Sequence, residues 1–174
     1  MAHSMRSDLT TNYGPPTGGR RETAQRYALV PLRVFLGVTF IYAALDKLTD
    51  SAFFKASGGG SIGDQMRGVR DTSAIPELVD LALKSPAGFG YAIAFGELAV
   101  GIGTLLGVLA RLAAVGGALI SLSLWLTVSW ATQPYYLGND LAYLMAWLPL
   151  VLAGAAVWSV DSWWRGRRLR SSEY

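Results

Sequence analysis

The sequence contains no cysteine and only one histidine, His3, among its 174 residues. The lack of cysteine excludes disulfides, thiolate nucleophiles, cysteine-bound zinc and thiolate-ligated iron–sulfur clusters. His3 lies in a polar N-terminal stretch, so we expect neither histidine acid–base catalysis nor haem ligation, and no metal site. Redox chemistry in such a chain would have to come from a bound organic cofactor or from a partner protein.

Charged residues are also scarce, while apolar residues are abundant. Only 16% of the chain is charged and 52% is hydrophobic, which is too little polar material for an ordinary soluble surface. Four apolar segments, at about 27–47, 87–109, 112–130 and 141–160, approach the roughly 20 residues that a helix needs to cross a hydrocarbon layer of about 30 Å. Continuous apolar runs favour helices over the alternating strands of a barrel. The predicted fold class is therefore all-α, an integral membrane four-helix bundle over residues 27–160.

Basic residues gather in the regions before the first predicted span, between the second and third, and after the fourth. They are Arg6, Arg20, Arg21, Arg26, Arg111, Arg165, Arg167, Arg168 and Arg170. By the positive-inside rule these regions are cytoplasmic, so we expect a multi-pass plasma-membrane protein with both termini inside. The arginines at the membrane boundaries account for the pI near 9.3. We therefore expect the lipid bilayer to be a partner of this chain, and we expect no binding of nucleic acid. Residues 1–26 are predicted to be a disordered cytoplasmic tail, and 161–174 a basic cytoplasmic tail.

A long connection, residues 48–86, is then placed on the outer side. Its stretch "GGGSIGDQMRGVRD" predicts a flexible glycine-rich segment, and "IPELVDLALKS" predicts a short amphipathic helix that begins after Pro76. Such a helix could lie on the bilayer surface or cap the bundle. A substrate lid is the alternative role for this loop.

Small residues follow one stripe along the second predicted span. The stripe consists of Ala92, Gly96, Ala99, Gly103, Gly107 and Ala110. Because small side chains let helices approach closely in lipid, we expect this stripe to be a packing face.

Three ionisable residues lie within or at the end of the predicted spans. Arg33 and Lys47 share one face of the first span, and Glu97 lies near the middle of the second. An unpaired charge at such depth costs several kcal/mol, so we expect Glu97 to be buried with Arg33, or failing that Lys47, as its partner. The alternative is a protonated Glu97 that is hydrogen-bonded to a neighbouring helix and serves packing alone.

A second candidate group lies at the start of the fourth span. Asp140, Tyr143 and Trp147 share one helix face, which could join Asp46 and Lys47 to form a polar pocket open to the outside. The alternative is that Asn139 or Asp140 caps the helix by accepting its free N–H groups.

These polar residues within hydrophobic helices resemble the pattern of the DoxX/DoxD-like membrane protein family, and of its DoxD branch in particular. The resembling stretches are "RVFLGVTFIYAALDKL", "GELAVGIGTLLGVLARLAA", "LSLWLTVSW" and "YYLGNDLAYLMAWLPL", which together cover all four predicted spans. The resemblance implies a four-helix membrane bundle. For DoxD-like members it also implies a subunit of thiosulfate:quinone oxidoreductase, which couples oxidation of thiosulfate to tetrathionate with reduction of a membrane quinone.

Together, the residues and the resemblance predict a membrane subunit of a quinone-linked oxidoreductase. Arg33 or Lys47 would stabilise negative charge on the quinone or hold an anionic substrate, and Glu97 would relay protons. The expected quinone or substrate pocket consists of Phe40, Trp125, Trp147, Tyr143 and Asp140.

The expected protein partners are a second oxidoreductase subunit or a second copy of the chain. The rival interpretation is a non-catalytic membrane anchor or assembly partner of a redox complex, whose polar residues only hold its helices together.

Overall fold

The computed structural model describes residues 18–155 and 157–161, and all regular secondary structure in these ranges is helical. The predicted basic tail lies outside the described residues except for Asp161. The seven α-helices are α1 (Gly18–Tyr27), α2 (Val30–Thr49), α3 (Ile62–Val69), α4 (Pro76–Leu83), α5 (Pro86–Leu106), α6 (Ala110–Leu124) and α7 (Asn139–Ala153). Shorter elements are the 3-10 turns η1 (Arg70–Thr72) and η3 (Tyr135–Leu137) and the π-helix η2 (Trp125–Ser129).

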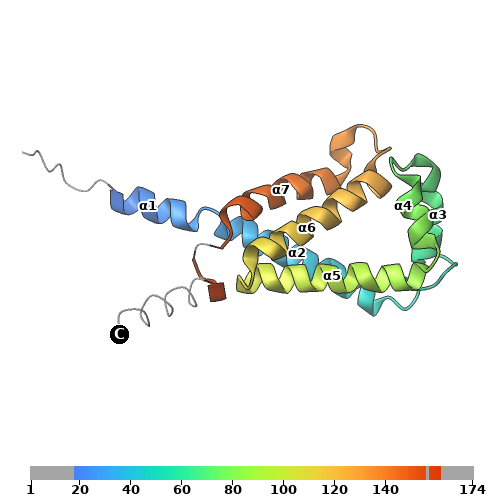
Figure 1. Cartoon of the computed structure of the whole chain (residues 1–174), viewed down its shortest axis with the longest axis horizontal. Coiled ribbons are helices and arrows are strands. Elements are labelled where there is room, and N and C mark those ends of the chain that lie inside the picture. The colour runs from blue at the N-terminus through green and yellow to red at the C-terminus, as the bar shows by residue number, and fades with distance from the viewer. Residues whose placement is uncertain (1–17, 156, 162–174) are drawn as a thin grey trace, which may run out of the picture.

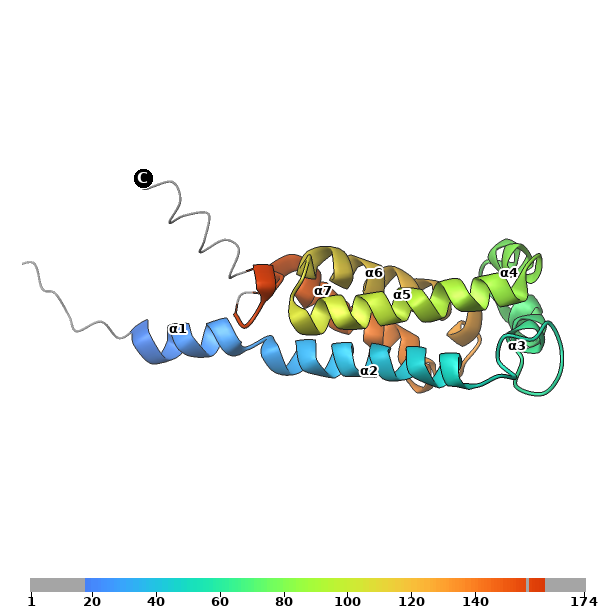
Figure 2. The same ribbon diagram turned by 90° about the horizontal axis from the view of Figure 1, so that it is seen from below.

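Helices α2, α5, α6 and α7 pack side by side into a bundle (Figures 1 and 2). Helix α5 lies between α2 and α6, and α7 covers α6 and part of α2. Helices α3 and α4 cover one end of the bundle, which we call the capped end. Residues 154–155 and 157–161, which we call the strap, lie across the opposite end, from which α1 extends, and we call this the strap end. Helices α2 and α5 run antiparallel between the two ends.

Three segments are long and apolar enough to cross a membrane: Thr23–Thr49, Pro86–Leu106 and Ala110–Ser129. They correspond to the first three predicted spans. The fourth helix differs, because α7 ends at Ala153 and its 15 residues rise only about 22 Å. Gly154 adopts a positive φ of 67° there and its N–H donates to Leu150 O, which ends the helix. The predicted helical span over 141–160 is therefore wrong at its C-terminal end.

The segment predicted to be a disordered tail also differs in part, because α1 forms over Gly18–Tyr27. Residues 1–17 lie outside the described residues.

The long connection between α2 and α5 is structured over most of its length. The predicted helix after Pro76 is α4, but α3 precedes it within the stretch expected to be flexible. Ser61 begins α3 by accepting a hydrogen bond from the backbone N–H of Asp64, a capping arrangement that "SIGD" encodes. On the far side of α3, Ala74 N donates to Leu126 O (2.8 Å), which attaches the connection to the π-helix η2.

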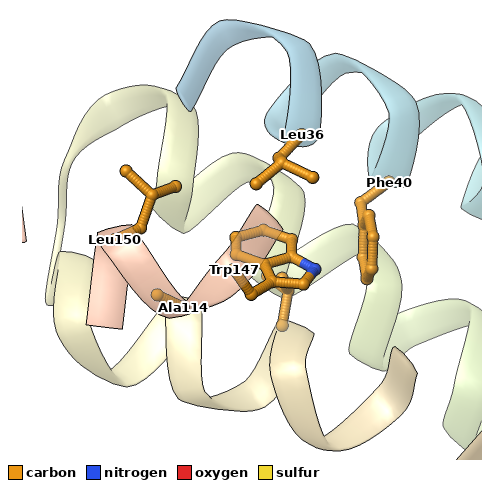
Figure 3. Packing of buried hydrophobic residues seen from close by; sticks show 6 residues of the cluster. Leu36, Phe40, Ala114, Trp147 and Leu150 are labelled. Carbon is orange, nitrogen blue, oxygen red and sulfur yellow. The ribbon is translucent and has the colours of Figure 1, made fainter. Parts of the chain in front are cut away.

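The hydrophobic core lies between α2, α5, α6 and α7 and centres on Trp147 (Figure 3). This side chain has no exposed surface, and its ring meets that of Phe40 edge to face at 4.9 Å. Its indole nitrogen points toward the Phe40 ring and is buried without a hydrogen-bond partner (Figure 3). Gly117 on α6 makes room for Trp147, because a Cβ there would lie 2.3 Å from Trp147 Cε2.

Glycines set the distance between α5 and its two neighbours. A Cβ on Gly101 would lie 2.9 Å from Gly37 O and 2.9 Å from Ile41 N, so α2 and α5 touch through their backbones. On the predicted small-residue stripe, Gly96 and Gly103 face Ile120 and Ala113 of α6 with more room. The stripe is thus a packing face at these two glycines and at the buried Gly107 and Ala110, although Ala92 and Ala99 are exposed.

The backbone contact predicts different costs for two alanine substitutions on α5. Gly101→Ala places a methyl group against the backbone of α2 and should lower the free energy of unfolding by about 1–3 kcal/mol. Gly96→Ala is the matched control, because its new methyl group would meet only Ile120 Cδ1 at 3.5 Å. Thermal unfolding in detergent measures both. Equal melting temperatures for the two variants would contradict the assigned helix contact.

Candidate functional site

Lys47 of α2 and Glu97 of α5 form an ion pair inside the bundle. Lys47 Nζ donates to Glu97 Oε1 (3.1 Å) and Oε2 (2.9 Å), and to Ala43 O (3.2 Å). Glu97 is 4% exposed, while the Lys47 side chain retains 23% of its surface. The pair is therefore closed on the side of the carboxylate and open on the side of the amine.

The antiparallel packing of α2 and α5 explains this pairing. Both residues lie on the capped-end side of the contact between Gly37 and Gly101. Measured along the helix axis, Lys47 is ten residues (about 15 Å) from Gly37 on α2, and Glu97 is four residues (about 6 Å) from Gly101 on α5. Side chains lean toward the N-terminus of their own helix. In antiparallel helices Lys47 and Glu97 therefore lean toward each other and close the remaining distance.

Arg33 is not the partner of Glu97, which corrects the first of the two predicted pairings. Arg33 lies four residues from Gly37 in the direction of the strap end, whereas Lys47 lies in the direction of the capped end. The side chain of Arg33 also leans toward the strap end. There Arg33 Nη1 donates to Val157 O and Nη2 to Trp158 O, both at 2.8 Å. The structure therefore separates Arg33 from the predicted cluster with Glu97 and Lys47.

Asp140 joins the Lys47–Glu97 pair from α7. Its carboxylate accepts a hydrogen bond from the Ser129 hydroxyl at the end of η2, and it is near enough to interact electrostatically with both Lys47 and Glu97. Neither Asn139 nor Asp140 makes a side-chain capping hydrogen bond at the start of α7, so the capping alternative is wrong in that form. The cluster thus contains two carboxylates and one lysine, of which Glu97 and Lys47 are in direct contact.

A cavity of about 110 Å³ lies between this cluster and the cap formed by α3. Among the described residues that line it, Lys47 alone is charged and Gln65 is the other polar side chain. Its apolar wall includes Phe53, Met66, Phe89 and Ile93. Lys47 therefore connects the buried carboxylate to an apolar chamber.

The π-helix η2 supplies another wall of this chamber through Val128. It also presents Leu126 O to the cap and Ser129 to Asp140. Such single-turn π-helices are often found at functional sites. One irregular turn thus contacts the cavity, the cap and the charged cluster.

The predicted aromatic residues do not form this cavity. Phe40 and Trp147 fill the hydrophobic core. The ring centroid of Tyr143 lies 6.4 Å from that of Phe40 and 6.1 Å from that of Phe35. Trp125 lies beside Trp130, with ring centroids 5.3 Å apart. Phe40, Tyr143 and Trp147 therefore pack near one another inside the bundle. None of the four predicted aromatic residues lines the cavity beside Lys47.

Sequence reasoning missed the cavity residues Phe53, Met66 and Phe89. A signal was present for α3, because Ser61 and Asp64 form a helix-start pattern and Ile62, Met66 and Val69 follow at the spacing of one helix face. No comparable pattern in the sequence indicates that Phe53 and Phe89 lie at the same cavity.

The ion pair predicts a strong effect of removing its cation alone. Lys47→Met leaves a buried carboxylate without a counter-charge and should lower the free energy of unfolding by about 3 kcal/mol. The double substitution Lys47→Met with Glu97→Met should recover most of that loss. Unfolding in detergent measures the cycle, with the exposed Lys84→Met as control. A Lys47→Met variant as stable as Lys84→Met would contradict the pairing.

The cap should loosen in acid. Hydrogen bonds from Arg70 hold the pKa of Asp80 below its usual value, and those from Arg67 do the same for Asp64. Because the folded pKa values are lowered, the stabilisation is present above the ordinary aspartate pKa and is lost as pH falls through the folded values. Amide hydrogen exchange in α3 and α4, corrected for intrinsic rates, should therefore rise between about pH 6 and pH 3.

Arg70→Gln provides the control for this effect, since it should raise exchange in α4 already at about pH 6. Protection that is the same at both pH values in the native chain would show that these bridges do not hold the cap.

A family model described as DoxX matches residues 28–130, more than half of the chain. No curated protein and no solved structure matches it. The matched range contains α2, α5 and α6, and with them Lys47 and Glu97, whereas Asp140 lies beyond it. DoxX is a membrane family linked to oxidoreductase-associated functions. By this match and by its long apolar helices, the chain belongs to the DoxX family of membrane proteins.

Proposed function

We propose that this DoxX protein is the membrane subunit of a quinone-linked oxidoreductase and that a quinone ring binds in the cavity beside Lys47. The observation that carries the proposal is a buried Lys47–Glu97 pair whose amine reaches an apolar chamber. Ligand sites in proteins combine mostly apolar walls with a few polar groups that fix orientation. At about 110 Å³ the chamber would admit one ring, and the isoprenoid chain would remain outside.

Lys47 is suited to stabilise negative charge on a quinone oxygen. Its amine contacts both oxygens of Glu97 and also Ala43 O, the longest of the three contacts at 3.2 Å. Exchange of the Ala43 contact for a quinone oxygen would leave the ion pair intact. A preorganised cation in a site of low dielectric constant stabilises such developing charge without reorganisation.

Glu97 and Asp140 would handle protons. Reduction of a quinone to a quinol takes two electrons and two protons. The Lys47 ammonium could pass a proton to the ring, and it would be reprotonated through Glu97 once that carboxylate had taken up a proton from outside; a second round would deliver the second proton. Asp140 and the Ser129 hydroxyl extend this polar cluster toward the end of η2. The electrons would come from a second subunit, because the chain contains no cysteine to ligate an iron–sulfur cluster.

The membrane topology that we propose places the strap end in the cytoplasm and the capped end outside, following the arginines of the sequence. In this arrangement α2, α5, α6 and α7 form a four-helix bundle in the plasma membrane. The 15 residues of α7 would cross it together with the strap, and the quinone cavity would lie in the outer half.

Thiosulfate is the donor implied by the DoxD resemblance. Lys47 faces two carboxylates, and the exposed Asp46 precedes it, so a thiosulfate dianion would meet net negative charge at this cluster. We therefore place thiosulfate oxidation to tetrathionate on the partner subunit, with this chain as the site of quinone reduction.

The second candidate function is a membrane anchor or assembly partner without chemistry. The direct backbone contact of α2 with α5 favours it, since the Lys47–Glu97 pair would then serve only to hold these two helices together.

Quinone binding by the purified chain in lipid nanodiscs distinguishes the two functions. Ubiquinone-1 should quench tryptophan fluorescence with a saturable response, and Ile93→Phe, which fills the cavity, should weaken binding at least about tenfold. Ile102→Phe is the matched control, because Ile102 is exposed on the same helix. Linear quenching without saturation in the native chain would overturn the quinone site and favour the anchor.

A measurement of enzymatic turnover tests the proposed electron donor independently of the proposed quinone site. Membranes that contain the chain and its partners should reduce quinone when thiosulfate is added, and Lys47→Gln should reduce that rate while Lys84→Gln leaves it unchanged. Saturable quinone binding without thiosulfate-dependent turnover would retain the quinone site and reject thiosulfate as donor.

A further inference from the structure

A second buried cation, Arg33, lies at the strap end and lacks an acidic partner among the described residues. It is 6% exposed, and its two terminal nitrogens donate to the carbonyl oxygens of Val157 and Trp158. Its Nε–H is buried without a hydrogen-bond partner. A guanidinium has five N–H donors, so these contacts leave part of its capacity unused.

The lack of a carboxylate sets Arg33 apart from Lys47. A buried charge is costly unless it is paired and hydrogen-bonded, and the two carbonyl groups provide dipoles but no negative charge. No ion pair in the described part of the chain involves Arg33, whereas Lys47 is paired with Glu97. The site around Arg33 is therefore electrostatically incomplete without an anion.

A cavity of about 80 Å³ adjoins Arg33 and offers room for one. Its wall is formed by Gln25 of α1, Val30 and Arg33 of α2, Leu150 and Ala153 of α7, and the start of the strap. The space corresponds to roughly two to three water molecules, which is the scale of a single phosphate group and excludes a whole lipid molecule. Apart from Gln25 and Arg33, the side chains of this wall are apolar.

We propose that this cavity binds the phosphate group of an anionic phospholipid. Val34, one turn beyond Val30, and Leu152, beside Ala153, are exposed at 45% and 78% and would contact the acyl chains. By the topology above, the site lies at the cytoplasmic leaflet, where anionic lipids meet basic pockets between transmembrane helices. The phosphate would accept from the N–H groups of Arg33 Nη1 and Nη2 that the two carbonyl contacts leave unused, and it would supply the missing negative charge.

A free phosphate ion shares the chemistry of the lipid headgroup but not its acyl chains. An ion would gain the contact with Arg33 and nothing from the exposed surfaces of Val34 and Leu152. Competition between inorganic phosphate and lipid therefore separates the two sources.

The test is native mass spectrometry of the full chain in detergent with equal amounts of dioleoylphosphatidylglycerol and dioleoylphosphatidylcholine. Both lipids carry a phosphate group, but Arg33 would repel the choline cation of phosphatidylcholine, so the native chain should retain phosphatidylglycerol over phosphatidylcholine by about tenfold. Inorganic phosphate in excess should leave this ratio unchanged. Displacement of the lipid by inorganic phosphate would assign the cavity to a free anion and overturn the proposal.

Cavity-filling variants locate the binding. Val30→Phe should reduce the retention ratio to about one while Val38→Phe, the same change at an exposed position of α2 outside the cavity, keeps it. Ala153→Phe fills the cavity from α7 at an exposed position, so it replaces Val30→Phe if that variant fails to fold. Equal retention of the two lipids by the native chain, or equal loss in Val30→Phe and Val38→Phe, would overturn the site.

Discussion

The antiparallel backbone contact between α2 and α5 is the constraint on which the rest of the structure depends. Gly37 and Gly101 let the two helices touch and thereby fix their relative level. Since side chains lean toward the N-terminus of their helix, this level directs Lys47 and Glu97 toward each other and turns Arg33 away. A shift of one turn between the helices, about 5.4 Å, would separate the buried carboxylate from its cation.

The two ends of the bundle neutralise their buried cations in different ways. At the capped end, Lys47 is paired with Glu97 beside an apolar cavity, with Asp140 near enough to interact electrostatically, an arrangement suited to holding a neutral ring and moving protons. At the strap end, the hydrogen-bond partners of Arg33 among the described residues are carbonyl dipoles beside a smaller cavity, an arrangement suited to receiving an anion from outside the chain. The proposed quinone and phospholipid sites follow from this difference in local charge.

The long connection and the strap are structural parts of these two sites. Helix α3 supplies Met66 to the wall of the cavity beside Lys47, and η2 holds the connection through Leu126 O. The strap supplies the carbonyls that orient Arg33, and its Asp161 carboxylate accepts from the backbone N–H groups of Leu109 and Ala110 at the start of α6. Each segment satisfies polar groups that would otherwise be exposed to lipid at a helix end.

The sequence alone determined the all-helical membrane character, the first three spans, the helix after Pro76 and the burial of Glu97, because hydropathy and the cost of an unpaired charge are local properties. Tertiary structure decided which cation reaches Glu97, where the fourth helix ends, and that Phe53, Met66 and Phe89 surround one cavity while Phe40 and Trp147 fill the core. These outcomes depend on the relative level and direction of packed helices. Residue spacing along a single helix contains no information about either quantity.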